Sequence, residues 1–389
     1  MPNTDADRYR VWGTASVAAL LTILLSLATA FWGVAEPYTF VDLDIYRESI
    51  KAITSGTTDT YAALPYPPVA FIAIWFLHLL PPVLGDQLWT GFSAALIIGI
   101  ALILAVRMME ATKRDWRAER WMLTALTATS ALLLVISMPV ISQLTSGQMS
   151  LVVMALAFID LSGVLPRRFR GALVGLGGAL KLTPLVFVAY YLVTGQRRNA
   201  AVAGGTFTAA TAVGWVIFPS ASWQFWTHVG GSEQFGDPAR RDNLSIHSML
   251  FRISPDLGSQ TWLWLLLGVT VVVLALWRSR VHFQRGEVME SFLTVGAAAT
   301  VVAPIAWPHY FIWLPLLGVW LWFVGTSRAR LVGGLVVLAY SPAGIPALLD
   351  PLTALHPRLV SVDDVLVLIP MAIAAFGLPH RPGQLDAPE

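Results

Sequence analysis

The chain has no cysteine, few charged residues and only three lysines. The lack of cysteine excludes disulfides, thiolate metal sites and cysteine nucleophiles. Charged residues make up 12% of the chain and hydrophobic residues 56%, whereas soluble domains carry roughly 25% and 45–50%. A net charge of +2 offers little to the phosphates of a nucleic acid, which is therefore not an expected partner. The composition of these 389 residues indicates a polytopic membrane protein.

About twelve apolar segments are long enough to enter a membrane. Their approximate ranges are 11–34, 66–82, 87–106, 121–138, 148–165, 170–194, 201–218, 260–277, 289–306, 308–325, 331–348 and 361–378. In lipid these segments must be helices, because every backbone polar group needs a partner within the protein. We therefore expect one all-α integral-membrane domain over residues 1–389, with its embedded core at 11–378. Several segments are short for a hydrocarbon core of about 30 Å, so we expect tilting or burial inside the bundle.

Arginines orient the second half of the chain. They occur at every second boundary between apolar segments, namely at 197–198, 278–285, 328–330 and 381. Because positive charge collects on the cytoplasmic side, these boundaries are predicted to be cytoplasmic. The loops at 35–65 and 219–260 then lie on the non-cytoplasmic side of the plasma membrane.

The first half of the chain is less consistent. Simple alternation of crossings would place the basic cluster at 113–120 outside, whereas charge bias would place it inside. One resolution is that the segment at 66–82 or at 170–194 does not cross once, but dips or folds back. Pro67-Pro68 and Pro184 are plausible breaks.

Asp42 and Asp44 follow the first apolar segment, within Phe40-Val-Asp-Leu-Asp-Ile-Tyr46. Acidic groups at this point do not help insertion into the membrane, so they suggest chemistry; an ordinary polar loop at the membrane surface is the alternative. Residues at i and i+2 do not share a helix face, so one carboxylate can point at a cavity and the other at solvent. An Asp-x-Asp pair could hold a divalent cation, but no third carboxylate lies in a comparable position. We therefore expect neither a metal nor another cofactor.

Lys181 interrupts an apolar run from Gly171 to Val193. A cation inside the membrane is costly and usually faces a cavity or a partner. Lys181 is therefore a candidate counter-charge for a phosphate. The alternative is a lysine that snorkels to the membrane interface.

Three further candidates lie at the starts of apolar segments. Tyr66 opens the second segment together with Pro67 and Pro68, where proline suits a first helical turn. Gln148 precedes the segment at 148–165 and could cap that helix or bond a sugar hydroxyl, and capping is the favoured interpretation. His309 could contact a phosphate, or it could be an ordinary interfacial residue beside its aromatic neighbours.

The loop at 219–260 mixes hydrogen-bond donors and acceptors, which suits a polyhydroxylated ligand or a phosphate, although a solvated loop is an equal alternative. Its polar residues include Glu233, Asp237, Arg240, Arg241, Asp242, Asn243, Ser245, His247 and Arg252. Asp42, Asn243, Arg252 and His309 are all predicted on one membrane face. A carboxylate base and several cations gathered there describe a site that transfers a group from an anionic lipid.

Six motifs occur in an order that resembles glycosyltransferase family 87. They are Val41-Asp-Leu-Asp-Ile-Tyr46, Leu64-Pro-Tyr-Pro-Pro68, Gly147-Gln148, Lys181-Leu-Thr-Pro184, Asp242-Asn-Leu-Ser245 with Arg252, and Pro304-Ile-Ala-Trp-Pro-His309. Members of this family are integral-membrane enzymes of the GT-C fold. The chain looks most like the actinobacterial polyprenol-phosphate-mannose-dependent α-1,2-mannosyltransferases that extend phosphatidylinositol mannosides or lipoarabinomannan. It departs from the family pattern at Leu244, where glutamine is common, and at Tyr310, where a second histidine is common.

The resemblance implies a donor, an acceptor and a set of site residues. The expected donor is a polyprenyl-phosphate sugar, the acceptor is a glycolipid in the bilayer, and the transfer inverts the anomeric centre on the periplasmic side. Asp42 matches the catalytic aspartate of the family and would act as general base. The residues expected to bind the donor phosphate or the substrate are Lys181, Arg252, His309, Asn243, Ser245, Gln148, Tyr66, Asp44 and Tyr46.

Other classes of function stay open at this point. Arabinosyltransferases that use polyprenyl-phosphate arabinose share this architecture. A lipid or sugar transporter would need polar groups along a path across the membrane, whereas the candidates here cluster toward one face. A non-catalytic scaffold would not explain an intramembrane lysine.

Overall fold

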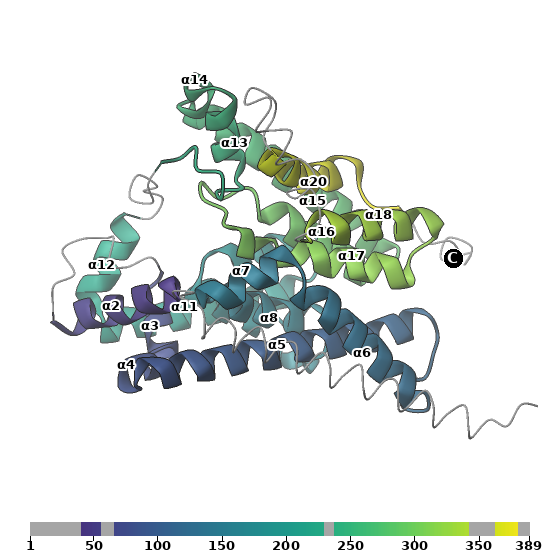
Figure 1. Cartoon of the computed structure of the whole chain (residues 1–389), viewed down its shortest axis with the longest axis horizontal. Helices are drawn as coiled ribbons and strands as arrows, with labels where there is room; N and C mark the ends of the chain where they lie inside the picture. The colour runs from purple at the N-terminus through teal and green to yellow at the C-terminus, as the bar shows by residue number, and fades with distance from the viewer. Residues whose placement is uncertain (1–39, 56–65, 229–236, 342–361, 380–389) are drawn as a thin grey trace, which may run out of the picture.

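The computed structural model describes residues 40–55, 66–228, 237–341 and 362–379 (Figure 1). Within these ranges the regular structure is entirely helical. The predicted segment at 11–34 and the loop around Asp350 lie outside the described residues, as does Glu233.

The described part of the chain forms helices of very unequal length. In chain order they are α2 (Val41–Ser55), α3 (Val69–Ala73), α4 (Phe76–Leu79), α5 (Pro82–Ala111), α6 (Arg120–Val135), α7 (Met138–Ser146), α8 (Ser150–Leu161), η2 (Arg167–Phe169), α9 (Ala172–Leu180), η3 (Thr183–Leu185), α10 (Val186–Val193), α11 (Arg197–Ile217), α12 (Pro219–Thr227), α13 (Ile246–Ile253), α14 (Pro255–Gly258), α15 (Thr261–Gln284), α16 (Val288–Ala299), η5 (Pro308–Ile312), α17 (Trp313–Val324), α18 (Ser327–Ala339) and α20 (Val362–Phe376).

Three of the described helices are long and apolar enough to cross a membrane, namely α5, α11 and α15. The pair α6 and α7, bent by 71°, is a fourth candidate. The other apolar helices have 10–17 residues. The described part of the chain therefore has the all-helical architecture of a membrane protein, but within it only three or four of the dozen expected segments have the length of a full crossing. An apolar run in the sequence shows only that its residues are hydrophobic, not where the backbone turns. In the structure, turns divide several of these runs into short helices.

The two segments suspected of folding back are both broken. The segment at 170–194 is divided into α9 and α10 by an extended residue, Lys181, and by η3, which contains Pro184. The break expected at Pro184 is thus confirmed. The segment at 66–82 consists of the short helices α3 and α4. Pro67-Pro68 opens α3 rather than breaking a longer helix, and the interruption falls at Ile74–Trp75.

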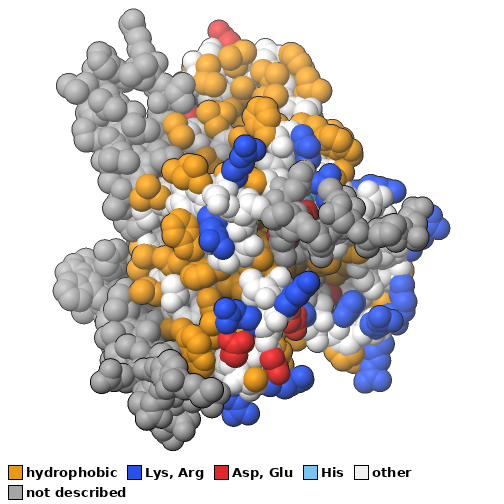
Figure 2. All heavy atoms as spheres, turned by 90° about the vertical axis from the view of Figure 1, so that its right-hand side faces the viewer, with side chains coloured by type: hydrophobic (Ala, Val, Ile, Leu, Met, Phe, Trp, Pro, Cys, Tyr) orange, Lys and Arg blue, Asp and Glu red, His pale blue; other side chains and the backbone are white. Residues whose placement is uncertain are grey.

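The long helices α5, α11 and α15 meet at one end of the bundle. Arg107 near the end of α5, Asn199 at the start of α11 and Phe283 at the end of α15 line one cavity. We call this the basic end, because Lys and Arg side chains gather on the side of the molecule where α5 ends and α6 begins (Figure 2). The cluster at 113–120 follows α5 directly and so lies at the same end as the arginines at 197–198 and 278–285. Charge bias predicts this grouping and simple alternation does not.

The helix α2 lies at the opposite end of α5, beside α3 and α4 (Figure 1). Its residues Leu43, Tyr46 and Ile50 are fully buried, and they pack in one small cluster with Phe71 of α3 and Trp89 of α5. Burying an aliphatic side chain of this size contributes about 1.5–3 kcal/mol. This packing holds the first turn of α2, which carries both aspartates, against the rest of the bundle.

Candidate active site

Arg47 connects α2 to the start of α5, and the two aspartates of α2 differ in their exposure. Arg47 donates to Asp44 at 2.8 Å, to Asp86 of α5 at 2.5 Å and to the carbonyl of Pro82 at 3.1 Å. The side chain of Asp44 is 66% exposed, whereas Asp42 is half-buried. The expectation that the two carboxylates point in different directions is therefore met. Asp44, which is predicted to bind substrate, accepts a hydrogen bond from Arg47 of the same helix.

A glycine brings the end of α7 against α2. Gly147 ends α7 in the left-handed conformation, with φ of 71°. A Cβ at this position would lie 2.5 Å from Cγ of Leu43. Both the backbone conformation and the close approach therefore require glycine. The consequence is that Gln148 lies next to the first turn of α2.

The side chain of Gln148 is held by two tyrosines. Its Oε1 accepts hydrogen bonds from Tyr46 at 3.0 Å and from Tyr66 at 2.8 Å, and the two rings meet edge to face. The backbone N–H of Met149 donates to the Tyr46 hydroxyl at 3.1 Å. Because Oε1 accepts both hydroxyl protons, the amide NH₂ group is left to donate to Asp42. Gln148 thus links α2 to the start of α8 and presents a donor to the carboxylate.

The capping interpretation of Gln148 is wrong. The N-cap of α8 is Met149, without a side-chain bond. Gln143 satisfies this helix start instead, because its Oε1 accepts from the backbone N–H of Leu151 at 3.1 Å and its amide donates to the carbonyl of Gln148. Sequence spacing did not single out Gln143, since a polar residue inside an apolar helix has no unique partner in sequence.

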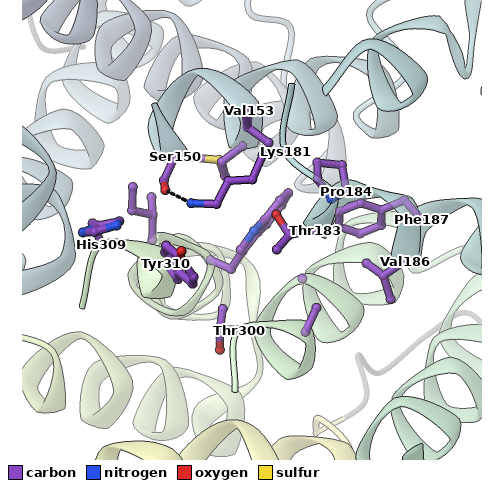
Figure 3. A pocket seen from close by; sticks show the side chains of 15 residues that line it. Ser150, Val153, Lys181, Thr183, Pro184, Val186, Phe187, Thr300, His309 and Tyr310 are labelled. Carbon is purple, nitrogen blue, oxygen red and sulfur yellow. Dashed lines mark hydrogen bonds between the residues drawn. The ribbon is translucent and has the colours of Figure 1, made fainter. Parts of the chain in front are cut away.

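Lys181 lies inside the protein, at the break between α9 and η3. Its Nζ donates to Oγ of Ser150 at 2.8 Å (Figure 3). The ammonium also lies 3.8 Å from the ring centroid of Tyr310 and 5.3 Å from that of Tyr66. Aromatic faces attract a cation most when water is excluded. Lys181 is buried, so it is not a lysine that snorkels to the surface. Tyr310, which stands where the resemblance expects a second histidine, forms part of its cage.

Burial and two neighbours set the protonation of Asp42. Loss of solvent raises the pKa of its carboxyl group to about 6, while the ammonium of Lys181 and the hydrogen bond from Gln148 lower the pKa and limit the rise. A carboxyl group with this pKa is ionised near neutral pH and is basic enough to accept a proton from a hydroxyl group. The arrangement suits general-base catalysis.

The rate of a reaction that uses Asp42 as base is expected to fall as the pH drops through about 6. Below this pKa the carboxyl group is protonated and cannot accept a proton. A profile of kcat/KM against pH for the purified protein measures the midpoint of the acid limb. A midpoint near 4, the usual value for aspartate, would mean that Asp42 is solvated in the free enzyme.

His309 has an unsatisfied nitrogen in the same site. The residue is buried in η5, its ring lies edge to face with Tyr310, and Nε2 has no hydrogen-bond partner among the described residues. A buried polar atom without a partner costs about 1–3 kcal/mol, which a bound ligand group can recover. His309 lines a cavity together with Lys181 and Tyr310. The apolar side chains of Val186 and Phe187 line another part of the same cavity (Figure 3). Such a lining fits an amphiphilic ligand.

Asn243 and Ser245 support the segment that leads to His309. Asn243 accepts from the backbone N–H of Ala306 at 2.9 Å and donates to the carbonyl of Pro304, which also accepts from Oγ of Ser245 at 3.0 Å. Ser245 is also the N-cap of α13. These two residues, predicted to bind substrate, therefore hold the loop before η5 in place.

Arg252 forms hydrogen bonds with other protein groups and is not among the residues that line the cavity. Its Nε and Nη2 donate to Oδ1 of Asp364 at 2.9 and 2.6 Å, and its Nη1 donates to the carbonyls of Arg240 and Asn243 and to Ser248. The pair fastens α13 to α20. Its partner stands 112 positions away, so the sequence alone gave no sign of it.

Replacing Arg252 with methionine is expected to lower the free energy of unfolding by about 3–5 kcal/mol, because it removes the guanidinium group that forms an ion pair with the buried carboxylate of Asp364. Equilibrium unfolding in detergent micelles measures this loss. Arg240→Gln is the matched control, since Arg240 pairs with Asp242 at the surface and such pairs contribute about 0–1 kcal/mol. A rise in the donor KM of Arg252→Met at unchanged stability would instead make Arg252 a substrate ligand.

The site thus combines a half-buried carboxylate, a caged ammonium and an unsatisfied imidazole within a helical membrane protein. Residues 64–308 match the sequence profile described as Glycosyltransferase family 87. Because this match covers more than half of the 389 residues, the chain belongs to glycosyltransferase family 87.

Characterised relatives support this membership. The chain is 27% identical over 340 residues to a polyprenol-phosphate-mannose-dependent α-(1-2)-phosphatidylinositol mannoside mannosyltransferase of Mycobacterium tuberculosis, covering 79% of this chain and 77% of the relative. It is 29% identical over 354 residues to a polyprenol-phosphate-mannose-dependent α-(1-2)-phosphatidylinositol pentamannoside mannosyltransferase of Mycolicibacterium smegmatis, covering 86% and 83%. No solved structure gives a significant match.

Proposed function

We propose that this glycosyltransferase moves mannose from a polyprenyl-phosphate-mannose donor to a phosphatidylinositol mannoside or a related lipoglycan, and that it forms an α-1,2 linkage. The two kinds of relative share their donor and linkage and differ in the acceptor that their names give. The observation that carries the proposal is that the half-buried carboxylate of Asp42 and the buried ammonium of Lys181 lie near enough for the charge of Lys181 to lower the pKa of Asp42.

The reaction needs one base and one cationic group. The acceptor hydroxyl attacks the anomeric carbon of a β-linked mannosyl phosphate while Asp42 takes the hydroxyl proton. The bond between that carbon and the phosphate oxygen breaks, and its electron pair leaves with polyprenyl phosphate. Lys181 and His309 stabilise the charge that develops on the phosphate. A single carboxylate that acts as base gives inversion, whereas retention needs a carboxylate nucleophile.

We place the active site on the non-cytoplasmic face. Asp86 near the start of α5 holds α2 through Arg47, whereas Arg107 near its end lies at the basic end. These positions on one helix are 21 residues apart, which corresponds to about 32 Å, close to the thickness of the hydrocarbon core. If the basic end is cytoplasmic, as charge bias favours, Asp42 faces the periplasm. The short apolar helices then complete a GT-C bundle of about twelve segments that enter the plasma membrane.

A product assay tests the proposed function. The purified protein in nanodiscs is incubated with radiolabelled polyprenyl-phosphate mannose and a phosphatidylinositol mannoside, and the lipids are separated. We expect an extended glycolipid whose new bond is cleaved by an α-1,2-mannosidase. Parallel incubation with polyprenyl-phosphate arabinose tests the alternative donor. Movement of unmodified donor across the bilayer, without a new glycosidic bond, would identify a transporter instead.

A further inference from the structure

A second cavity lies at the basic end, away from the proposed active site. It has a volume of about 350 Å³. Its lining residues lie at or near the ends of α5, α8, α10 and α15 and at the starts of α11 and α16. Ser150, which binds Lys181, and Asp160, which lines this cavity, stand at opposite ends of α8. Ten residues of helix separate them, which corresponds to about 15 Å. The second cavity is therefore distinct from the first.

Two guanidinium groups converge on this cavity. Gly163 follows α8 with φ of 77°, and a Cβ there would lie 3.5 Å from Nη2 of Arg170 and 3.7 Å from Nη2 of Arg107. Nε of Arg107 is buried and has no hydrogen-bond partner among the described residues. The absence of a side chain at Gly163 leaves the space between the two cations open.

Among the described residues, Glu110 is the carboxylate that forms an ion pair with one of these arginines, and Arg170 donates to the backbone carbonyls of Leu165 and Gly163. Asp160 lines the cavity, but its two oxygens accept from the Tyr191 hydroxyl and from three backbone N–H groups around the start of α9. Glu110 contacts only Nη1 of Arg107, and its side chain is 44% exposed. Such a surface contact contributes little. An anion with several oxygens would satisfy the remaining donors of both arginines.

We propose that this cavity binds a phosphate group between Arg107 and Arg170. The planar fork of arginine matches phosphate oxygens in pairs, and Arg107 is 26% exposed, so the group can enter from outside. The position at the basic end of the helices, where anionic lipids meet basic pockets, favours the headgroup of an anionic phospholipid over a soluble phosphate. This site does not depend on the proposed transfer reaction.

Binding of lipids to the full-length protein in detergent tests the proposal. Native mass spectrometry is carried out with added phosphatidylglycerol, phosphatidylcholine or inorganic phosphate. We expect wild type to retain one phosphatidylglycerol in preference to phosphatidylcholine, and Arg107→Gln/Arg170→Gln to retain it at least tenfold more weakly. Arg168→Gln, which removes an exposed arginine of the same loop, should bind as wild type does. Displacement of the lipid by millimolar inorganic phosphate would identify a soluble phosphate as the ligand of the same site.

Two results would overturn the proposal. Equal retention of phosphatidylglycerol and phosphatidylcholine by wild type would mean that no site selective for anionic phospholipids exists, since both lipids carry a phosphate and only the first has a net negative charge, and this readout needs no variant. Retention of phosphatidylglycerol by the double variant at the wild-type level would show that the two guanidinium groups do not bind the lipid. Arg107→Gln alone, which breaks only a contact at the surface, serves if the double variant does not fold. Mannosyl transfer by the same samples reports separately on the proposed function.

Discussion

Replacing Asp42 with asparagine is expected to lower the rate of mannosyl transfer by about 10²–10⁴-fold, the usual contribution of a general base. Asparagine keeps the shape of the side chain but cannot take the proton from the acceptor hydroxyl. The fold should persist, because α2 is held by Leu43, Ile50 and Arg47 rather than by Asp42. Single-turnover rates with saturating donor, together with a donor-binding assay, separate loss of chemistry from loss of binding.

Asp44→Asn is the matched control for this experiment. Asp44 lies on the same helical turn but is largely exposed, and Arg47 retains Asp86 and Pro82 as partners without it. We expect transfer close to the wild-type rate. Full activity of Asp42→Asn would remove Asp42 from the mechanism. Equal losses in both variants would indicate that two carboxylates act, and the stereochemistry of the product would then have to be determined again.

Replacing Lys181 with methionine is expected to lower the transfer rate by about 10²–10³-fold, comparable to the loss of one preorganised charge-stabilising group. The same change removes the positive charge that lowers the pKa of Asp42. The acid limb of the pH profile should therefore move to higher pH in this variant. A purely structural role of Lys181 would not predict this second effect, so the two readouts together test its place in the site.

Ser150→Ala provides the control for Lys181. It removes the hydrogen bond at 2.8 Å but leaves the ammonium against the ring of Tyr310. We expect a smaller loss of rate and an acid limb that stays in place. Unchanged donor kinetics in Lys181→Met would show that this lysine does not meet the donor phosphate.

Features that depend on neighbouring residues could be predicted from the sequence. Some residue types are unfavourable inside or beside an apolar segment, and they can be recognised from the residues next to them. Here they are a lysine inside an apolar run, a proline three positions later and two aspartates after a hydrophobic segment. The structure gives a broken helix at Lys181 and divergent orientations for Asp42 and Asp44. The membrane class followed from the composition, and the family followed from the six motifs that contain these residues.

Features that depend on distant residues could not be predicted. The bond from Tyr46 to Gln148 spans 102 positions and the pair of Arg252 with Asp364 spans 112. In the described ranges, hydropathy also did not separate full-length helices from apolar runs that are divided into short ones, since it carries no information on where the backbone turns. Tyr310 was noted only as a departure from a family pattern, and its contact with Lys181 became apparent only in three dimensions.

The short helix α8 also sets how deep the proposed chemistry would lie. Lys181 reaches Ser150 at one end of α8, while the other end of this helix lies at the basic end. The length of about 15 Å between them is half the thickness of the hydrocarbon core. A lipid phosphate normally rests among the headgroups in water, so a donor that enters from the non-cytoplasmic face and meets Lys181 would have to descend below the headgroups and shed its hydration. On this geometry the rate of turnover would depend on the thickness and lateral pressure of the surrounding bilayer.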